Sequence, residues 1–356
     1  MNFDSAFFLN LEKKLTVRFS VLLFFLLTGF FAESQELRIA FGSCGHQDKP
    51  LSILKDVAKT KPDYFIFLGD NIYGDTRDMK LLESKYQQLG KNKNFKALKK
   101  KTKILATWDD HDFGENDAGK YYPKKQESKE LFLDFFEEPK DSERRTREGI
   151  YTSYMIEHEK MLVQIILLDC RTFRSDLKLY DSTYSVDTIF RHQLDYLPIV
   201  DEDSTLLGNE QWYWLTEELQ KKADVRIIGS STQFGISFNG YEAWANFPYE
   251  RERMLDVISK TKANGVIFIS GDVHYGELSK YFNKKTYPIF DLTSSGLTQT
   301  WSFATPNTHR IGGPVMENNY GVITINPKNQ KVRMQIINDK KYNKIDVKIP
   351  LKELKF

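Results

Sequence analysis

Short apolar runs separated by amphipathic stretches are the feature of this sequence that most restricts its fold. Side chains that are β-branched or aromatic dominate the runs, which lie at residues 37–41, 64–68, 104–107, 162–168, 225–228 and 266–269. Helical patterns fall between them, at residues 51–60, 79–98, 127–136, 210–222 and 249–262. Strands that alternate with helices are typical of α/β folds. We therefore predict six buried strands with helices packed against them.

The C-terminal segment follows a different pattern. Residues 320–325, 332–337 and 345–349 alternate apolar and polar side chains, which is typical of antiparallel strands with one solvated face. Turn-forming residues separate these runs at positions 326–327 and 338–339. The predicted fold is therefore α/β with antiparallel strands at its C-terminal end.

The composition agrees with one large folded domain. The chain holds 26 Phe and 18 Tyr, which is enough apolar material for a sizeable core. We find no internal repeat and no low-complexity linker, so we expect a single domain over residues 35–356. The formal net charge is +2, from 51 Lys and Arg against 49 Asp and Glu, and this balance gives no support to a nucleic-acid partner. Two cysteines, Cys44 and Cys170, cannot make a disulfide framework.

The N-terminal segment, residues 1–34, is typical of a signal peptide. Three basic residues precede an apolar run at residues 19–31, and small residues follow near Ser34. The run is shorter than the roughly 20 residues of a membrane-spanning helix. We expect cleavage near Ser34 and a periplasmic or extracellular protein. Because the basic residues sit late in the segment, an uncleaved N-terminal anchor is the alternative.

A lysine-rich segment departs from the even charge of the rest. Nine lysines and one acidic residue, Glu83, lie between residues 80 and 103, within a predicted helical cap near residues 76–103. Such a segment is usually a solvated helix face. The alternative is that it attracts an anionic polymer or a lipid head group towards a nearby site.

Metal-binding residue types follow four of the predicted strands where each strand ends. They are Cys44 after the first, Asp70 and Tyr73 after the second, Asp109, Asp110, His111 and Asp112 after the third, and Asp272 and His274 after the sixth. Loops at the carboxyl ends of strands form the usual ligand crevice of α/β proteins, and glycines there let the backbone approach a bound group. The four loops meet only if their strands are neighbours.

Convergence of these carboxylates would require cations. Carboxylates within about 5 Å repel one another, which raises their pKa values and destabilises the ionised site unless metal ions neutralise the charge. Oxygen ligands suit Ca²⁺, Mg²⁺, Mn²⁺ or ferric iron, and the sequence offers them at Asp70, Asp110, Asn116 and Asp272. The imidazole of His274 suits a transition metal.

Two further residues extend this set, and each has a simpler explanation. Cys44 and Tyr73 add thiolate and phenolate ligands, so two different metals would use the whole set better than one. Alternatively, Cys44 is a buried thiol, Tyr73 is a core or rim side chain, and Asp70 forms a turn or caps a helix. The acidic run at residues 109–112 would ordinarily be solvated, but here it directly follows an apolar strand.

The order of these segments resembles that of the PhoD-like alkaline phosphatases and phosphodiesterases of the metallophosphatase superfamily. Seven blocks look like family blocks and occur in family order, at residues 41–44, 69–73, 107–117, 167–174, 207–212, 244–251 and 270–274. The resemblance covers roughly residues 37–320. It implies a metallophosphatase-type β-sandwich flanked by helices, in the layer order αββα.

The resemblance also implies a ferric ion and a second metal, often calcium, although other divalent metals are possible. The implied ligands are Cys44, Asp70, Tyr73, Asp110, Asn116, Asp272 and His274. Asp70 is expected to bridge the two metals, and Cys44 and Tyr73 to bind the ferric ion. Asp110 or Asn116 would hold the second metal. How Asp272 and His274 are divided between the two metals stays open.

The same resemblance places His111 nearest the scissile ester oxygen. A hydrogen bond with Asp109 or Asp112 would let His111 stabilise the phosphorane-like oxygen or protonate the leaving alkoxide. We therefore name His111 and Asp109 as the candidate catalytic residues. Whether Asp109, Asp110 or Asn116 contacts a metal directly stays open.

Substrate contacts are expected from Asn116 and from an arginine. The family's substrate arginine would be Arg171 or Arg174. Asp169 lies beside Arg171 in the same block, however, and this arrangement also suggests a structural ion pair, which we favour for Arg171.

These inferences predict an exported, metal-dependent phosphoesterase that uses a metal-activated hydroxide. Its substrates would be phosphomonoesters or, as the favoured natural substrate, phosphodiesters, including nucleotide or polymer diesters. A phospholipase D-type lipid phosphodiesterase is one alternative, which the lysine-rich segment and the aromatic Trp244 and Phe247 leave open. A non-catalytic binder of phosphorylated glycans is the other. Activity should prefer neutral to alkaline pH, because protonation of the ligands releases metal.

Overall fold

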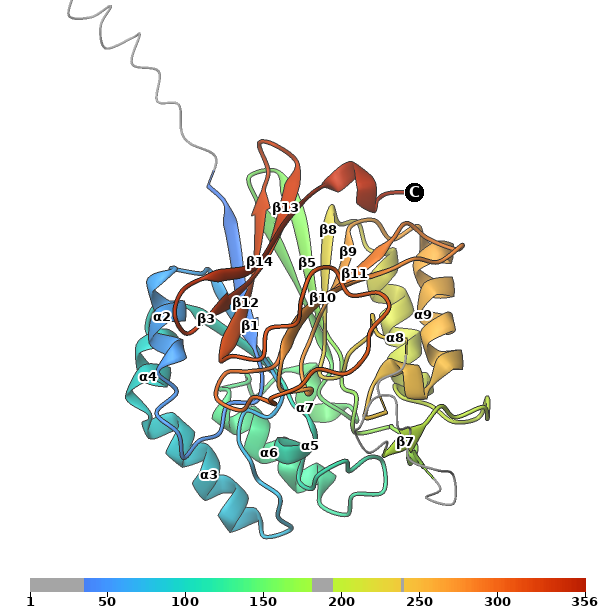
Figure 1. Ribbon diagram of the computed structural model, residues 1–356. Helices are drawn as coiled ribbons and strands as arrows, with labels where there is room; N and C mark the ends of the chain where they lie inside the picture. Colours follow the sequence, from blue (N-terminus) through green and yellow to red (C-terminus); the bar gives the residue numbers. More distant parts are fainter. Residues whose placement is uncertain (1–34, 181–194, 238–239) are drawn as a thin grey trace, which may run out of the picture. The chain divides into compact units, whose positions relative to one another are not determined.

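Two six-stranded sheets carry the fold (Figure 1), and the computed structural model describes residues 35–180, 195–237 and 240–356. The first sheet contains β1 (Leu37–Gly42), β2 (Tyr64–Leu68), β3 (Lys103–Thr107), β12 (Asn319–Asn326), β13 (Lys331–Asn338) and β14 (Asn343–Pro350). The second contains β4 (Thr152–His158), β5 (Met161–Leu167), β8 (Val225–Ser230), β9 (Val266–Ser270), β10 (Gly276–Tyr281) and β11 (Ile289–Ser294). A short separate pair is formed by β6 (Lys178–Leu179) and β7 (Tyr196–Leu197).

Each large sheet combines parallel and antiparallel strands. The first has the order β14-β13-β12-β1-β2-β3, with β1, β2 and β3 parallel and β12, β13 and β14 antiparallel. The second has the order β10-β11-β9-β8-β5-β4, with parallel inner strands and antiparallel edges at β10 and β4. The six predicted buried strands and the antiparallel C-terminal strands are therefore confirmed.

Helices cover the outer faces of the two sheets (Figure 1). The helices on the first sheet are α2 (Ile53–Lys59), α3 (Met79–Lys91), α4 (Lys93–Lys99) and α6 (Lys125–Phe135). The second sheet is covered by α8 (Gly208–Gln220) and α9 (Pro248–Thr261). The shorter elements are α5 (Asp110–Phe113), α7 (Glu143–Thr146), η1 (Trp244–Asn246) and η2 (Leu351–Leu354). This arrangement confirms the predicted αββα sandwich.

Alternation along the strands explains why the two sheets face each other. In β1, Ile39 and Phe41 belong to the large core between the sheets, whereas Ala40 packs against the helices on the other face. In β2, Ile66 joins the core between the sheets, and Phe65 packs outward. Side chains two residues apart share a face of a strand, so an uninterrupted apolar run can fill two cores at once.

The helix predicted at residues 79–98 is two helices, α3 and α4, separated by Asn92. The backbone of Asn92 is extended, and its side-chain oxygen accepts hydrogen bonds from the backbone N–H groups of Asn94 and Phe95 at 2.9 and 3.3 Å. This cap begins a new helix, because it satisfies N–H groups that have no partner in a first helical turn. The new direction lets Phe95 and Leu98 reach the core.

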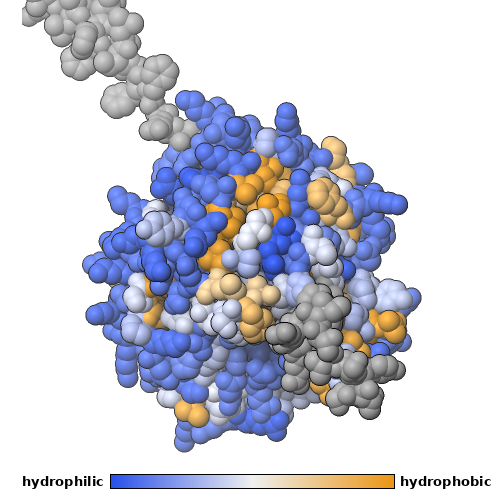
Figure 2. Space-filling view, in the orientation of Figure 1, coloured by the Kyte–Doolittle hydropathy of each residue, from blue (hydrophilic) through white to orange (hydrophobic). Residues whose placement is uncertain are grey.

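The lysine-rich segment coincides with α3 and α4, over which the face shown in Figure 2 is mostly hydrophilic. The predicted signal peptide at residues 1–34 lies outside the described residues and stays a prediction. The region from Glu36 to Phe356 forms one compact unit. Among the described ranges, no helix combines the length and the apolar character needed to cross a bilayer.

Candidate metal centre

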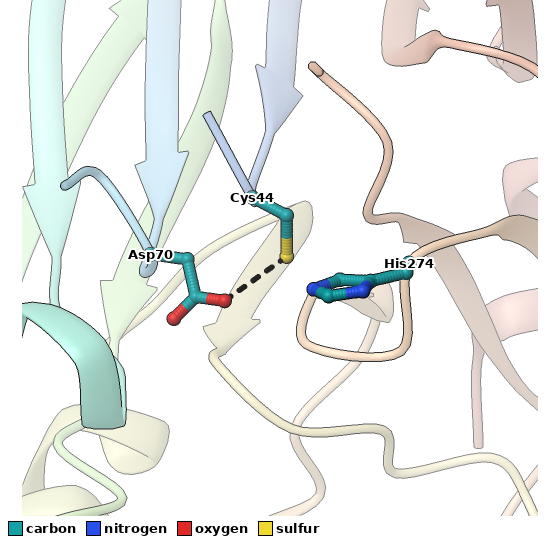
Figure 3. Close-up of side chains that lie close together, drawn as sticks. All are labelled: Cys44, Asp70 and His274. Carbon is teal, nitrogen blue, oxygen red and sulfur yellow. Dashed lines mark hydrogen bonds between the residues drawn. The ribbon is translucent and has the colours of Figure 1, made fainter. Parts of the chain in front are cut away.

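Four loops that carry the predicted ligands meet at one edge of the sandwich. Three of them follow the parallel neighbours β1, β2 and β3, and the fourth follows β9 of the other sheet. Figure 3 shows the side chains of Cys44, Asp70 and His274 turned towards one another from three of these loops. The expected convergence of residues far apart in the sequence is therefore what the structure shows.

The first ligand group contains a thiol, a carboxyl, a phenol and an imidazole. Cys44 Sγ lies 3.2 Å from Asp70 Oδ2, and Tyr73 Oη lies 3.3 Å from the same oxygen. Tyr73 Oη also lies 3.2 Å from Nε2 of His274. Each of the four side chains is thus close to at least one other, and the group is buried or half-buried.

A second group shares one member with the first. Asp70, Asp110 and His111 each offer a ligand atom within 4.8 Å of the other two, and Cys44, Asp70 and His274 do the same. Asp70 therefore belongs to both groups, as the expected bridging position requires. A third group, Asp110 with Asp117 and Glu242, adjoins the second through Asp110.

Strained backbone places several of these side chains. Cys44, Asp70, Asp272 and His274 have φ values of 58°, 48°, 74° and 54°, a region that residues other than glycine seldom occupy. Such conformations persist when surrounding structure enforces them, and they gather at functional sites. Gly69, at φ 98°, has a different requirement, because a Cβ there would lie 2.3 Å from Cβ of Asp109. The loop after β2 can approach the loop after β3 only with glycine at this position.

Burial makes this group costly to ionise without a cation. Burial, together with the charges of neighbouring acids, raises the pKa values of Asp70 and Asp272 well above the usual range. Burial likewise raises the pKa of the Cys44 thiol to about 12. Burial lowers the pKa of His274 to about 4, so its imidazole is neutral at physiological pH and has a free electron pair for a metal.

The donor set fits metal ions. Asp70 Oδ1 is buried and has no hydrogen-bond partner among the described residues, although buried polar atoms are normally paired. A cation would satisfy this oxygen and remove the repulsion among the acids. Thiolate, phenolate and imidazole in the first group suit a transition metal, and the two carboxylates of the second group, Asp70 and Asp110, suit a harder ion.

His111 is held by a carboxylate that the sequence did not reveal. Its Nδ1 lies 2.7 Å from Oδ1 of Asp75, so its partner is Asp75 rather than the expected Asp109 or Asp112. Burial would lower the pKa of His111, but Asp75 and Asp110 outweigh it and raise this pKa to about 9. The imidazole is therefore protonated at neutral pH before any metal binds. Asp112 instead accepts hydrogen bonds from the backbone N–H groups of Asp109 and Asp70.

Asp109 belongs to a buried ion-pair network. Its Oδ1 accepts a hydrogen bond of 2.6 Å from Nε of Arg171, whose Nη2 lies 2.6 Å from Oε2 of Glu242. Arg171 is fully buried, which agrees with a structural ion pair. The guanidinium does not pair with Asp169, as the sequence suggested, although the backbone N–H of Arg171 donates a 3.0 Å hydrogen bond to Oδ1 of Asp169. Asp169 accepts hydrogen bonds from Trp108 Nε1 and from backbone N–H groups.

A cavity of about 170 Å³ opens beside these groups. It is lined by Asp70, Asp110, His111, Asn116, Asp117, Asp195, Tyr196, Tyr241, Glu242, Asp272, His274 and Trp301. Asn116 is exposed and donates a 2.9 Å hydrogen bond to Asp117, while Asp272 lies buried at the cavity wall. Asp110, Asn116 and Asp272 thus face the same space as Asp70 and His274. Cys44 and Tyr73 are not part of the cavity lining.

Sequence patterns did not reveal every residue that lines or supports this cavity. Asp75, Asp117, Glu242 and Trp301 were missed, although Asp75 and Asp117 each lie close to a predicted ligand along the chain. Trp244 and Phe247, which had left a lipid substrate open, do not line it. Both are buried in the core, where Trp244 Nε1 donates to Ser230 Oγ.

A family model of PhoD-like phosphatases matches residues 39–352. The chain belongs to this family. Alkaline phosphatase D of Bacillus subtilis (strain 168) is 24% identical over 322 residues, an alignment that covers 76% of this chain and 52% of that protein. The chain therefore spans about half the length of this relative. The resemblance inferred from the seven sequence blocks is confirmed.

Solved structures agree with the family in fold. A structure of PhoD superposes with a TM-score of 0.67 at 19% identity, covering 84% of this chain and 65% of that chain. GAP50, described as the anchor in the inner membrane complex of Plasmodium, superposes with a TM-score of 0.55 at 11% identity, covering 88% of this chain and 89% of that chain. A dimetal phosphatase from Danio rerio superposes with a TM-score of 0.50 at 12% identity, covering 88% of this chain and 99% of that chain. At these identities the likeness concerns the fold alone.

Proposed function

We propose that this chain is an exported, metal-dependent hydrolase of phosphoric esters, with residues 35–356 as a single domain and phosphodiesters as its favoured substrates. One observation carries the proposal. Asp70 belongs to two potential ligand groups of different chemistry, and members of both groups line one open cavity. A pair of metals that shares a carboxylate ligand is the arrangement that in-line displacement at phosphorus uses.

The chain's own residues suggest how two metals would be divided. Cys44, Tyr73 and His274 would hold ferric iron together with Asp70, because sulfur, phenolate and imidazole ligands favour a transition metal. Asp110 would hold calcium with Asp70, because hard cations prefer carboxylate oxygens.

Asp272 and Asn116 line the cavity and would complete the calcium site. When bound, the metals would supply an activated water and draw the phosphate oxygens.

His111 is the proton donor of the proposed reaction. Its Nδ1 is occupied by Asp75, which leaves Nε2 for the ester. Hydrolysis forms a bond between the oxygen of water and phosphorus and breaks the bond from phosphorus to the ester oxygen. The departing alkoxide takes a proton from His111, whose ion pair with Asp75 favours the protonated imidazole, and the proton that the attacking water gives up replaces it.

Asn116 and Asp109 take different roles in this scheme. Asn116 is exposed at the cavity, so its amide can contact a phosphate oxygen. Asp109 acts through Arg171 as a positioning residue, because its buried ion pair holds the loop that also carries Asp110 and His111.

Metal content and ester hydrolysis test the proposal together. The protein is purified without chelators, its metals are quantified, and a phosphomonoester, a bis-ester and a phospholipid are assayed side by side. We expect iron and calcium, with the bis-ester hydrolysed fastest. The same measurements are made on Asp70→Asn, which removes the carboxylate common to both ligand groups. The variant Asp134→Asn, on the exposed face of α6, serves as its matched control.

The possible outcomes separate the alternatives. Bound metals without hydrolysis of any ester would indicate a binder of phosphorylated ligands, and preferred hydrolysis of the phospholipid would indicate a lipid phosphodiesterase. Zinc or manganese alone would change the roles assigned to Cys44 and Tyr73. Export is tested separately by fractionating expressing cells and sequencing the N-terminus of the protein, which should begin near Gln35.

A further inference from the structure

One side of the cavity is aromatic. Tyr241 and Trp301 lie together there, and Tyr196 lines the cavity beside Asp117, to whose Oδ2 its hydroxyl donates a hydrogen bond. The ring centroids of Tyr241 and Trp301 lie 5.0 Å apart, at an interplanar angle of 49°. The proposed metal and proton-transfer chemistry uses none of these rings, so their position beside the metal centre requires another explanation.

Trp301 is fixed in place at the edge of the metal centre. Its backbone N–H donates a 3.0 Å hydrogen bond to the carbonyl oxygen of His274, and its ring centroid lies 5.3 Å from the His274 imidazole. The Trp301 ring also stacks on Phe303, with centroids 5.1 Å apart and planes 9° from parallel. Phe303 is 39% exposed. The stack therefore runs from a proposed ligand out to solvent.

The size of the cavity limits what can lie on this surface. About 170 Å³ is smaller than the roughly 300 Å³ at the lower end of small-molecule pockets. The cavity can enclose a phosphate group and the nearest part of an ester, while the rest of the ester extends over the rim. Two acyl chains would have no enclosed space there, whereas a flat ring can stack on flat rings at an open rim.

The charge of the lining restricts the substrate further. Among the described residues, the lining contains six carboxylates and no lysine or arginine; the acids are Asp70, Asp110, Asp117, Asp195, Glu242 and Asp272. Bound metals would compensate the acids nearest to them and the scissile phosphate. A second phosphate on the substrate would meet uncompensated acids at the rim, which would weaken its binding.

We infer that Trp301, with Tyr241 and Phe303, forms a subsite for a planar ring carried by the alcohol part of a singly charged phosphodiester, such as a nucleoside. This inference rests on the proposed phosphodiesterase function and names its substrate class. The reaction is the hydrolysis described above, with the ring-bearing alcohol as the leaving group. Stacking on Trp301 would hold that alcohol beside the scissile bond and next to His111.

A matched pair of substrates tests the subsite. Thymidine 5′-(methyl phosphate) is compared with the corresponding deoxyribose ester that carries a methoxy group in place of the base, so that the two 5′ alcohols that leave differ only in the base. We expect kcat/KM to be about 5- to 100-fold higher with the base present, the range found for stacking of a base on an aromatic side chain. Adding a 3′-phosphate to the thymidine ester should lower kcat/KM.

Variants locate the effect. Trp301→Leu should reduce the ratio between the two esters to near 1, and Trp301→Phe should retain most of it, because a flat ring is kept. Tyr213→Leu, which removes an aromatic ring 74% exposed on α8, serves as the control and should leave the ratio unchanged. If Trp301→Leu does not fold, Phe303→Leu at the exposed end of the stack should still lower the ratio.

The outcomes distinguish this inference from the function on which it rests. Hydrolysis of both esters at equal rates by the unaltered protein, or faster hydrolysis of phosphatidylcholine, overturns the aromatic subsite and leaves a phosphoesterase. An unchanged ratio in the Trp301→Leu variant overturns the assignment to Trp301. Absence of hydrolysis with every ester, despite full metal content, overturns the proposed function and the subsite together.

Discussion

Buried acids occur in two different settings in this molecule. Asp109 and Glu242 lie against the guanidinium of Arg171, at 2.6 Å in each case. Asp70 and Asp272 lie among other acids, and neither forms an ion pair with a lysine or arginine of the described chain. Burial raises the pKa of Asp109 only to about 6, because Arg171 opposes it, whereas the pKa values of Asp70 and Asp272 rise much further.

The difference shows where the chain supplies its own counter-charge and where it depends on a bound ion. A buried carboxylate is tolerated when a cation and hydrogen bonds compensate it. The ion-pair network meets this condition with protein groups alone. The group around Asp70 does not, so its ionised form requires external cations. Asp110 joins the two settings, because it faces the cavity but also lies 3.9 Å from Nη2 of Arg171. Burial would raise its pKa, but Arg171 and His111 outweigh burial and lower this pKa to about 2.

Replacing Asp70 should give the largest effect and should separate the two settings. We expect Asp70→Asn to lower kcat/KM for a bis-ester by at least about 1000-fold and to lower the content of both metals, because this carboxylate is shared. The metal-free variant should be more stable than the metal-free parent by about 1–2 kcal/mol, because asparagine does not have to take up a proton when the chain folds at neutral pH. Metal analysis, kinetics and urea unfolding measure the three effects.

Asp291 provides the contrasting control for that stability change. It is fully buried, but its carboxylate accepts hydrogen bonds from the backbone N–H groups of Phe234 and Gly235 and from Ser270. The variant Asp291→Asn should destabilise the protein in the presence or absence of metal. A loss of stability in metal-free Asp70→Asn as large as in Asp291→Asn would contradict the proposed difference between the settings.

Replacing Arg171 tests the ion-pair network, in which protein groups alone compensate the buried acids. We expect Arg171→Met to lower the free energy of unfolding by about 3–5 kcal/mol, because Asp109 and Glu242 would be left buried without a cation. Arg333→Met, which breaks a largely solvent-screened pair with Asp346, should cost less than about 1 kcal/mol. Denaturant unfolding at neutral pH measures both. Equal losses for the two variants would mean that burial does not matter in this network.

The pH dependence of stability should differ between the metal-free and metal-loaded protein. Burial and neighbouring acids raise the pKa of Asp117 to about 7, and Asp70 and Asp272 are also raised, so the folded metal-free chain holds protons that the unfolded chain has lost. Its stability must then fall as pH rises through these values. His111, with a pKa raised to about 9, acts in the same direction. Above pH 6.5 the lowered pKa of His274 no longer opposes this trend.

Thermal unfolding between pH 6.5 and pH 8 tests this prediction. The midpoint of the chelator-stripped protein should fall over this range. The midpoint of the metal-loaded protein should stay level or rise, because metals displace the protons and bind more tightly at higher pH. Parallel slopes for the two forms would show that the ligands are not the groups that titrate.

Local sequence pattern was sufficient for most of the fold but not for the short pair β6 and β7 or for three strands of the two large sheets. Continuous apolar runs predicted the inner strands, because strands buried on both faces contain few polar residues. The edge strand β4 and the pair β10 and β11 were missed. In β10 and β11, buried Glu277, Ser279 and Asp291 interrupt the apolar pattern, and their compensation comes from distant residues such as Arg310 and Gln233. Such networks exist only after folding, so a single run of sequence cannot reveal them.

The candidate site shows the same limit. Cys44, Asp70 and His274 were predictable because each follows the end of an apolar strand, where ligands gather in this type of fold. Glu242 was not predictable, since it follows no strand end and belongs to no motif, and its role comes from its ion pair with Arg171. Trp301 likewise gains its position from a backbone hydrogen bond to His274.

Replacing Asp75, an exposed acid that pairs with His111, should give the smallest effect on activity. We expect Asp75→Asn to lower kcat/KM by about 10-fold, in the range of changes to groups that orient a catalytic residue. The alkaline limb of the pH profile should move to lower pH, because His111 loses the carboxylate that raises its pKa. The control is Asp48→Asn, since Asp48 lies 3.8 Å from His46 and lines no part of the cavity. A lowered rate with an unmoved profile would show that Asp75 shapes the loop without acting on the proton of His111.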